Sequence, residues 1–183
     1  MKWKSLLVSA IILTQLSYPA SAKSNSQTPR SVSTSTATWS AIAYGQGQTP
    51  LNSAYTITWT VNSGKARDFF AIRNTGNFTI TGLTATVSQS QASSSGKPPS
   101  TSFDWCQNGI WNSSTNTCSG TIVSMGSATD VILTLTFSNL NLSVGSELSM
   151  RATTQPNLQN SYTSNISVSV SRSQIRTGVT SNS

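Results

Sequence analysis

Side chains that could move a proton at neutral pH are scarce in this sequence. The chain has 183 residues, no histidine and four carboxylates. The carboxylates are Asp68, Asp104, Asp130 and Glu147. Enzymes usually move protons with histidine, aspartate or glutamate groups whose pKa values are tuned toward neutral pH. The composition therefore predicts a protein that is not an enzyme and that needs no cofactor.

Two residue patterns in the chain could still indicate an enzyme, and neither meets the requirements of the chemistry that it suggests. A glycosidase needs two carboxylates roughly 5 to 10 Å apart across a cleft. Here the carboxylates are dispersed, and Asp68 and Asp130 stand at the starts of apolar strands, where solvated positions are expected. Ser94-Ser95-Gly96-Lys97 has the Ser-x-x-Lys spacing of penicillin-recognising enzymes, whose serine opens a helix. Pro98 and Pro99 follow and prevent that helix. We expect no catalytic residues.

The chain has two cysteines, Cys106 and Cys118. Two thiolates without a histidine cannot complete the usual four-ligand zinc set. Calcium would need several oxygen ligands in one loop, and the chain has no such cluster. We therefore expect no metal site. In an oxidising compartment the two cysteines would instead form a disulfide that closes a loop of about a dozen residues.

The segment around Cys106 is the most distinctive stretch, because tryptophans stand on both sides of the cysteine. Trp105 shares a strand phase with Phe103 and is expected in the core. Trp111 stands beside a polar run, so it is the better candidate for contact with a ligand, although a core position is an equal alternative. A sugar-binding face often combines an exposed ring with amides that bond the sugar hydroxyls. The candidate ligand contacts are therefore Trp111, Asn108 and Asn112.

The N-terminus has the sequence pattern of an export signal. A basic start is followed by the apolar run Leu6 to Leu16, and Ala20-Ser21-Ala22 has the small-x-small pattern of a cleavage site. The run is shorter than the roughly 20 apolar residues that cross a membrane, and no second hydrophobic span follows. We expect a signal peptide over residues 1–22 and no stable membrane insertion after its removal. The basic residues are scattered rather than gathered on one stripe, which argues against a nucleic-acid partner.

Period-two alternation of apolar residues with Ser and Thr dominates the rest of the chain. Runs 55–61, 131–137 and 166–170 show it most regularly, and such alternation is typical of antiparallel sheets with one face on a core. Trp39 and Trp59 share a phase with other apolar residues and are expected in the core. Between residues 77 and 87 the phase switches at Thr81-Gly82, where a bulge or bend is expected.

The domain boundaries follow from these patterns. We expect a flexible leader at residues 23–30, one β-domain at residues 31–172 and a flexible C-terminal tail at residues 173–183. No helical periodicity runs over ten or more positions. About nine short strands with regular turn signals predict an antiparallel β-sandwich, with a barrel as the alternative.

A family resemblance accompanies this pattern. Residues 68–87, DFFAIRNTGNFTITGLTATV, resemble the strand–Asn-Thr-Gly–strand hairpin of bacterial extracellular immunoglobulin-like modules. They also look like secreted bacterial surface-layer or fibre subunits of the kind typified by TasA and camelysin. The resemblance implies an immunoglobulin-like fold and an extracellular setting, and it implies no functional residues.

Two main hypotheses for function remain, and a secreted hydrolase or inhibitor is a residual third. The first is a secreted structural or adhesive protein of a cell surface or extracellular matrix that works through protein–protein or protein–glycan contacts, including self-association at unprotected strand edges. In this hypothesis Arg67 and Arg73 guard such edges. The second is a carbohydrate-binding module that uses the disulfide loop. The expected location is extracellular or at the cell surface, or periplasmic in a Gram-negative host.

Overall fold

The structure is a computed structural model, and it describes residues 38–51, 54–60, 66–91, 99–128, 132–154, 158 and 160–175. All of these residues lie within the unit Thr36–Ser183. The expected signal peptide (1–22), the expected leader (23–30) and the Ser-x-x-Lys motif (94–97) lie outside the described residues. So does the expected tail beyond Ile175.

The described residues form eleven β-strands and one short 3-10 turn. The strands are β1 (Ala41–Gly45), β2 (Tyr55–Trp59), β3 (Arg67–Asn74), β4 (Leu83–Gln91), β5 (Thr101–Gln107), β6 (Trp111–Asn112), β7 (Thr117–Cys118), β8 (Thr121–Ala128), β9 (Ile132–Phe137), β10 (Glu147–Thr154) and β11 (Tyr162–Ser169). The number exceeds the expected nine or so. The difference lies in β6 and β7, which have two residues each and are too short to show alternation.

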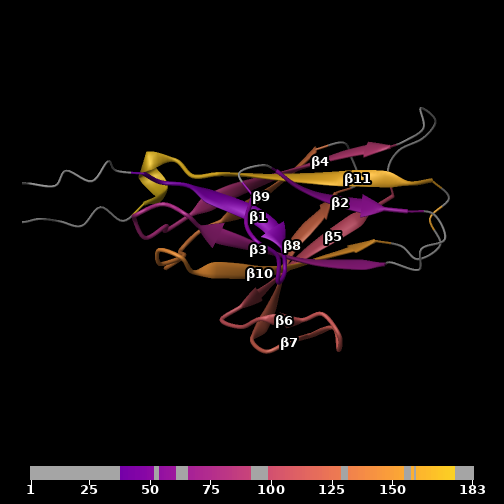
Figure 1. Cartoon of the computed structure of the whole chain (residues 1–183), viewed down its shortest axis with the longest axis horizontal. Helices are drawn as coiled ribbons and strands as arrows, with labels where there is room; N and C mark the ends of the chain where they lie inside the picture. The colour runs from indigo at the N-terminus through magenta and orange to yellow at the C-terminus, as the bar shows by residue number, and fades with distance from the viewer. Residues whose placement is uncertain are drawn as a thin grey trace, which may run out of the picture. The chain divides into compact units, whose positions relative to one another are not determined.

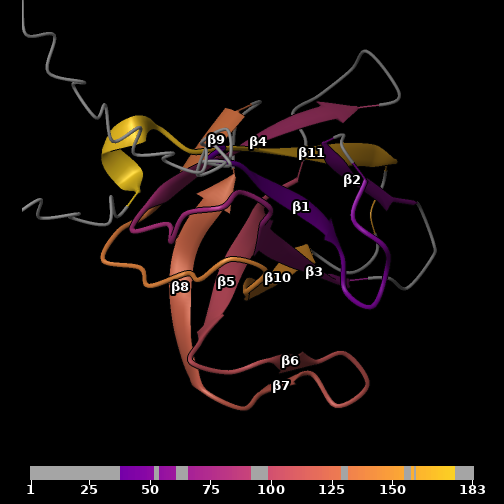
Figure 2. The same cartoon turned by 60° about the vertical axis from the view of Figure 1, so that its left-hand side comes forward.

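The strands form three antiparallel sheets. A five-stranded sheet has the order β1-β3-β10-β5-β8, a four-stranded sheet has the order β2-β11-β4-β9, and β6 pairs with β7. Every one of the described pairings is antiparallel. The all-β class and the antiparallel sheets predicted from alternation are therefore confirmed. Figures 1 and 2 show β6 and β7 projecting from the ends of β5 and β8.

The two larger sheets share one hydrophobic core. In the alternating runs, Ile57, Trp59, Leu135, Phe137 and Ile166 are at most 2 % exposed. The five-stranded sheet contributes Phe70, Ile72, Phe103, Met150 and Ala152, all completely buried. Alternate residues of each strand face this core, as the period-two pattern predicts.

Trp39 corrects one expectation about the core. Trp59 is buried as predicted, but Trp39 is 40 % exposed and precedes β1 instead of belonging to it. The backbone here follows a turn rather than a sheet: Asn77 N–H donates to the carbonyl of Thr38 at 2.9 Å. A Cβ on Gly76 would lie 2.6 Å from that same carbonyl oxygen, so the close approach requires glycine. Alternation alone could not reveal that the strand begins two residues later.

The Asn-Thr-Gly turn at residues 74–76 does not close a hairpin. It follows β3 of the five-stranded sheet, and the next strand, β4, belongs to the four-stranded sheet. The hairpin expected over residues 68–87 is therefore wrong. The completely buried side chain of Asn74 holds the crossing together by donating to the carbonyls of Phe78 (2.7 Å) and Leu142 (2.9 Å). The phase switch near Thr81-Gly82 marks this crossing between sheets.

The C-terminal end of the described chain packs against the same crossing. Arg172–Gln174 form the 3-10 turn, and Ile175 makes a bridge with Ile80. The main-chain N–H of Thr81 donates to the carbonyl of Gln174 at 2.7 Å. Ordered structure thus continues three residues past the expected domain end at residue 172. Among the described residues, no helix is long and apolar enough to cross a membrane.

Candidate functional site

The disulfide predicted from the sequence is present. Cys106 is the next-to-last residue of β5, Cys118 is the last residue of β7, and their Cα atoms are 5.6 Å apart at a sequence separation of 12. The loop that they close, called here the disulfide loop (residues 106–118), contains β6 and β7. At its neck a Cβ on Gly120 would lie 2.2 Å from the carbonyl oxygen of Gln107, so only glycine fits. A disulfide of this kind indicates an oxidising, extracellular-type compartment.

Trp111 is the anchor of the disulfide loop and not an exposed platform. Its side chain is 1 % exposed. The ring lies 6.2 Å from the ring of Phe69 on β3, and the guanidinium carbon of Arg151 on β10 lies 4.1 Å from the centre of the indole ring. Its main-chain N–H donates to the Ser149 hydroxyl at 3.0 Å. The expectation that Trp111 offers its ring to a ligand is therefore wrong, because the ring is buried beside residues of the distant strands β3 and β10.

Arg151 connects the disulfide loop to the sheet. Its guanidinium donates to Asp104 at 2.6 Å on the neighbouring strand β5 and to the side chain of Asn116 at 2.9 Å in the loop. The Arg151–Asp104 pair is largely shielded from solvent, with side-chain exposures of 17 % and 14 %. Partly buried, hydrogen-bonded ion pairs of this kind fix geometry as well as contribute energy. The loop is thus held by a disulfide, a cation–π contact and a charged hydrogen-bond network.

Asn112 has a role inside the loop. Its side-chain oxygen accepts from the N–H groups of Ser114 (3.0 Å) and Thr115 (3.1 Å), and from the hydroxyl of Ser114 (2.7 Å). This arrangement is an Asx-type turn that shapes the tip of the hairpin. The expectation that Asn112 contacts a ligand is not supported, because its oxygen is occupied by the turn.

Asn108 lines an open groove, and its expected role as a ligand contact stays a prediction. The groove lies between the neck of the disulfide loop and residues 139–142 and has a volume of about 670 Å³. Its wall includes Trp105, Gln107, Asn139 and Asn141. Trp105 is half-buried, with its ring edge-on to Phe137 at 5.9 Å, so its expected core position is met only in part. The amides at 139 and 141 were not predicted, since only the fold brings them beside Asn108.

The described carboxylates are each engaged by an arginine or a tyrosine. Asp104 pairs with Arg151, Glu147 accepts the hydroxyl of Tyr44, and Asp68 accepts the hydroxyl of Tyr55 at 2.8 Å. Asp68 is 8 % exposed, so the solvated position expected for it is wrong. Asp130 lies outside the described residues. In the described part of the chain no three His, Cys, Asp or Glu side chains gather into a group that could hold a metal ion.

Tyrosine hydroxyls in this structure hold their protons strongly. Burial raises the pKa of Tyr44 from 10.0 to about 12, with a further contribution from its hydrogen bond to Glu147. Burial also raises the pKa of Tyr55 and Tyr162. Near neutral pH these hydroxyls are therefore neutral donors that tie strands together.

Charge is distributed unusually between the edges and the interior of the sheets. The edge strands are β1 and β8 in the five-stranded sheet and β2 and β9 in the four-stranded sheet. Their sequences are AIAYG, TIVSMGSA, YTITW and ILTLTF, without a charged residue or a proline. Every charged residue in a described strand instead lies on β3, β5 or β10, which are inner strands.

The expected guard residues are therefore not at an edge. Arg67 and Arg73 belong to β3, which pairs with β1 on one side and β10 on the other. Arg73 lies directly opposite Glu147, with 3.8 Å between the guanidinium and the carboxylate. Proteins commonly block sheet edges with charged residues, prolines or bulges. Of these devices the described edges show one, an irregularity in the β5–β8 pairing beside Phe103 and Asp104.

The outer face of the four-stranded sheet is almost entirely hydroxyl-bearing. The hydroxyl-bearing residues lie opposite one another on neighbouring strands. Thr134 on β9 is opposite Thr86 on β4, and Thr86 is opposite Ser167 on β11. Neighbouring polar groups bond one another, as Ser90 and Thr163 do at 2.6 Å. This face offers neutral hydrogen-bonding groups without charge.

Comparison of the chain with protein-family models, with curated proteins and with solved structures found no match. Fold and site geometry therefore carry the functional argument.

Proposed function

We propose that this protein is a secreted, non-catalytic structural or adhesive component of a cell surface or extracellular matrix, and that copies associate through the edges of their sheets. The proposed fold is an immunoglobulin-like β-sandwich, supported by two antiparallel sheets on a shared core. The proposed export is supported by the N-terminal sequence pattern and by the disulfide.

One observation carries the proposal: the edge strands are uncharged while the inner strands hold the charge. An edge strand presents unpaired main-chain donors and acceptors, and a charged side chain there opposes pairing with another molecule. Here the arginines and carboxylates of the five-stranded sheet lie on the inner strands β3, β5 and β10, so they do not oppose pairing at an edge strand. Main-chain pairing between edges would then supply affinity without demanding a specific side-chain pocket.

The test compares association of two variants with equal added charge. We expect the mass of the wild-type protein, measured by light scattering with size exclusion, to rise with concentration. The edge variant carries Ile42→Lys, Thr58→Lys, Ser124→Lys and Thr134→Lys. The control variant carries Thr84→Lys, Thr86→Lys, Ser102→Lys and Thr163→Lys, all on inner strands.

We expect the edge variant to stay monomeric and the control variant to associate like the wild type. Thr134 and Thr86 face each other in register, as do Thr58 and Thr163, so two of the four added charges in each variant have a direct counterpart in the other. Circular dichroism of both variants confirms that they are folded. A wild-type chain that is monomeric at every concentration overturns the proposal, as does equal loss of association in both variants.

The groove beside Asn108 favours a second candidate function, a carbohydrate-binding module. Its amides and the half-buried Trp105 are the groups that bind sugar hydroxyls and pyranose faces. A glycan array with the wild type and with Gln107→Ala plus Asn141→Ala tests it. Binding that the double substitution abolishes supports the module, and the absence of binding to any glycan removes it. Ile132→Ala, an exposed change outside the lining of this groove, is the control and leaves binding unchanged.

A further inference from the structure

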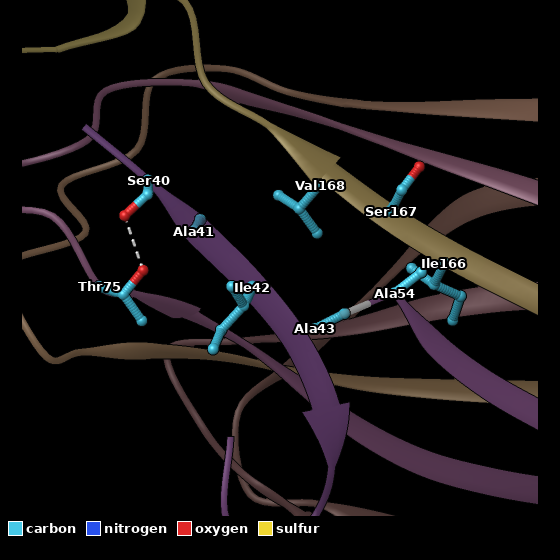
Figure 3. Close-up of a pocket in the computed structure, with 9 residues that line it drawn as sticks. All are labelled: Ser40, Ala41, Ile42, Ala43, Ala54, Thr75, Ile166, Ser167 and Val168. Carbon is cyan, nitrogen blue, oxygen red and sulfur yellow. Dashed lines mark hydrogen bonds between the residues drawn. The ribbon is translucent and has the colours of Figure 1, made fainter. Parts of the chain in front are cut away.

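Two grooves on the described surface differ in whether their polar groups are already bonded. The groove between β1 and β11 has a volume of about 290 Å³, and its wall includes Ala41, Ala43 and Ile166, which are at most 6 % exposed. Figure 3 shows the hydroxyls of Ser40 and Thr75 bonding one another at its end, 2.8 Å apart. This groove therefore offers a ligand little accessible surface and few free polar groups.

The amide-lined groove beside Asn108, formed by residues 105–110, 119, 139–142 and 146–148, has polar side chains that are free to bond a ligand. Within the part of the chain that the structure describes, no hydrogen bond is made by the side-chain amides of Gln107, Asn108, Asn139 and Asn141. Most other described amides are bonded, among them those of Gln46, Asn74, Gln89, Asn112, Asn116 and Asn165. Four amides with free donors and acceptors therefore gather in one groove.

Both walls of the amide-lined groove are held in place by the protein itself. On one side the disulfide closes the neck of the loop, and the main-chain N–H of Ile110 donates to the Ser119 hydroxyl at 2.9 Å. On the other side the main-chain N–H of Leu142 donates to the carbonyl of Ile80 at 3.0 Å. The groove is therefore preformed, and a ligand would not have to order its walls on binding.

The backbone at two of the four amides gives a second indication that their side chains have a role. Asn108 and Asn139, one on each wall, have φ values of 57° and 55°. This left-handed conformation is uncommon for residues with a side chain, and glycine adopts it most readily. Asparagine tolerates it better than most residues and keeps an amide at the position. Each wall thus retains a hydrogen-bonding side chain where the backbone alone would favour glycine.

The amide-lined groove offers no charged group to a ligand, although the chain is basic. The formal net charge of the chain is +7. Among the described residues that line the groove none is basic, and the charged one is Glu147. Its carboxylate accepts the Tyr44 hydroxyl and lies 3.8 Å from the guanidinium of Arg73. These partners lie on β1 and β3, on the side of β10 away from β5, so the carboxylate is directed away from the amides that follow β5.

We propose that the amide-lined groove binds an uncharged polysaccharide and discriminates against acidic and amino-bearing glycans, an inference that rests on the carbohydrate-binding role proposed above for this groove. Neighbouring hydroxyls of a hexose donate and accept, which matches the N–H and C=O groups of a side-chain amide. The half-buried Trp105 and the exposed Ile110 offer apolar surface to the C–H groups of the sugar ring. A charged sugar would lose hydration in the groove without gaining a partner of opposite charge.

A glycan array that holds neutral, acidic and amino-bearing glycans tests the proposal. We expect binding to neutral glycans to change by less than about twofold between about 0.15 M and about 1 M salt, because salt screens attraction between charges and leaves contacts between neutral groups in place. Acidic glycans are expected to bind only through the basic net charge of the chain, so that about 1 M salt releases them. Binding of acidic or amino-bearing glycans that equals or exceeds neutral binding at about 1 M salt overturns the inference.

Replacing two amides by carboxylates provides the second measurement. Asn108→Asp with Asn139→Asp removes amide donors from both walls and keeps residues that tolerate the left-handed backbone. Titration calorimetry with the neutral glycan that binds best on the array is expected to show at least about tenfold weaker affinity. The control, Gln48→Glu with Asn160→Asp, makes the same exchange at exposed amides outside the groove and keeps the wild-type affinity. Circular dichroism confirms that both variants are folded.

The outcomes separate this inference from the proposals before it. Salt-resistant binding to acidic or amino-bearing glycans alone overturns the inference and leaves the carbohydrate-binding candidate standing. Unchanged affinity in the Asn108→Asp/Asn139→Asp variant places neutral binding elsewhere and also overturns it. Absence of binding to any glycan removes both the inference and the carbohydrate-binding candidate. Association through sheet edges is measured separately by light scattering and does not depend on any of these results.

Discussion

Trp111 shows that the environment of a residue cannot always be predicted from the sequence around it. It precedes the polar run Asn112–Thr117, which predicts exposure, yet Phe69, Ser149 and Arg151 enclose it. Those partners lie on strands whose neighbourhood depends on sheet order, and no sequence spacing encodes that order. The disulfide was predictable because the chain offers no other pairing for its two cysteines.

Trp111→Ala is expected to destabilise the protein by about 3 to 5 kcal/mol, the usual cost of removing a large buried aromatic side chain. Urea denaturation measures the loss. Ile110→Ala at the neighbouring exposed position changes stability by less than about 0.5 kcal/mol. A Trp111→Ala protein as stable as the wild type would contradict the anchoring role.

Tyr44 makes stability sensitive to alkaline pH. Its pKa is about 12 in the folded protein against 10.0 for an ordinary tyrosine, so the unfolded chain releases this proton first. The contribution to stability is complete below pH 10 and is lost as the pH rises from about 10 to 12. Urea denaturation across this range shows the decline, and Tyr44→Phe makes it shallower. The same slope in the variant would show that Tyr44 contributes nothing to it.

At the scale of elements, regular alternation predicts strands well and their partners poorly. β2 and β9 fall within alternating runs and the second half of β11 overlaps one, and their inward residues there are the ones the pattern indicates. The Asn74–Gly76 turn has the sequence chemistry of a hairpin, but it joins two sheets. Buried hydrogen bonds from Asn74 to Phe78 and Leu142 decide this, and one of those partners is 68 positions away.

The disulfide loop is an element with several independent attachments. Replacing Cys106 and Cys118 together by alanine is expected to cost about 3 kcal/mol, the entropy of closing a loop of this length in the unfolded chain. The Trp111–Arg151 contact remains, so the near-ultraviolet circular dichroism of the folded variant stays close to that of the wild type. Collapse of that signal under native conditions would show that the disulfide alone positions the loop.

At the scale of the whole molecule, two kinds of surface are candidates for binding a partner. One is the amide-lined groove beside Asn108, which would act through side chains. The other is the set of uncharged edge strands, which would act through the main chain. The charges of the described strands lie on inner strands, and this favours the edges, because the four edge strands then carry no charged side chain that would oppose pairing.

Amide hydrogen exchange of the wild-type chain, compared between a dilute and a concentrated sample, tests this account most directly. Main-chain pairing between copies protects the amides that it engages. We predict that exchange slows on association at edge strands, foremost at Ala41–Gly45 of β1, and stays unchanged at residues 105–110 and 139–142. Slower exchange confined to the groove segments, or no change in any strand, would contradict the account.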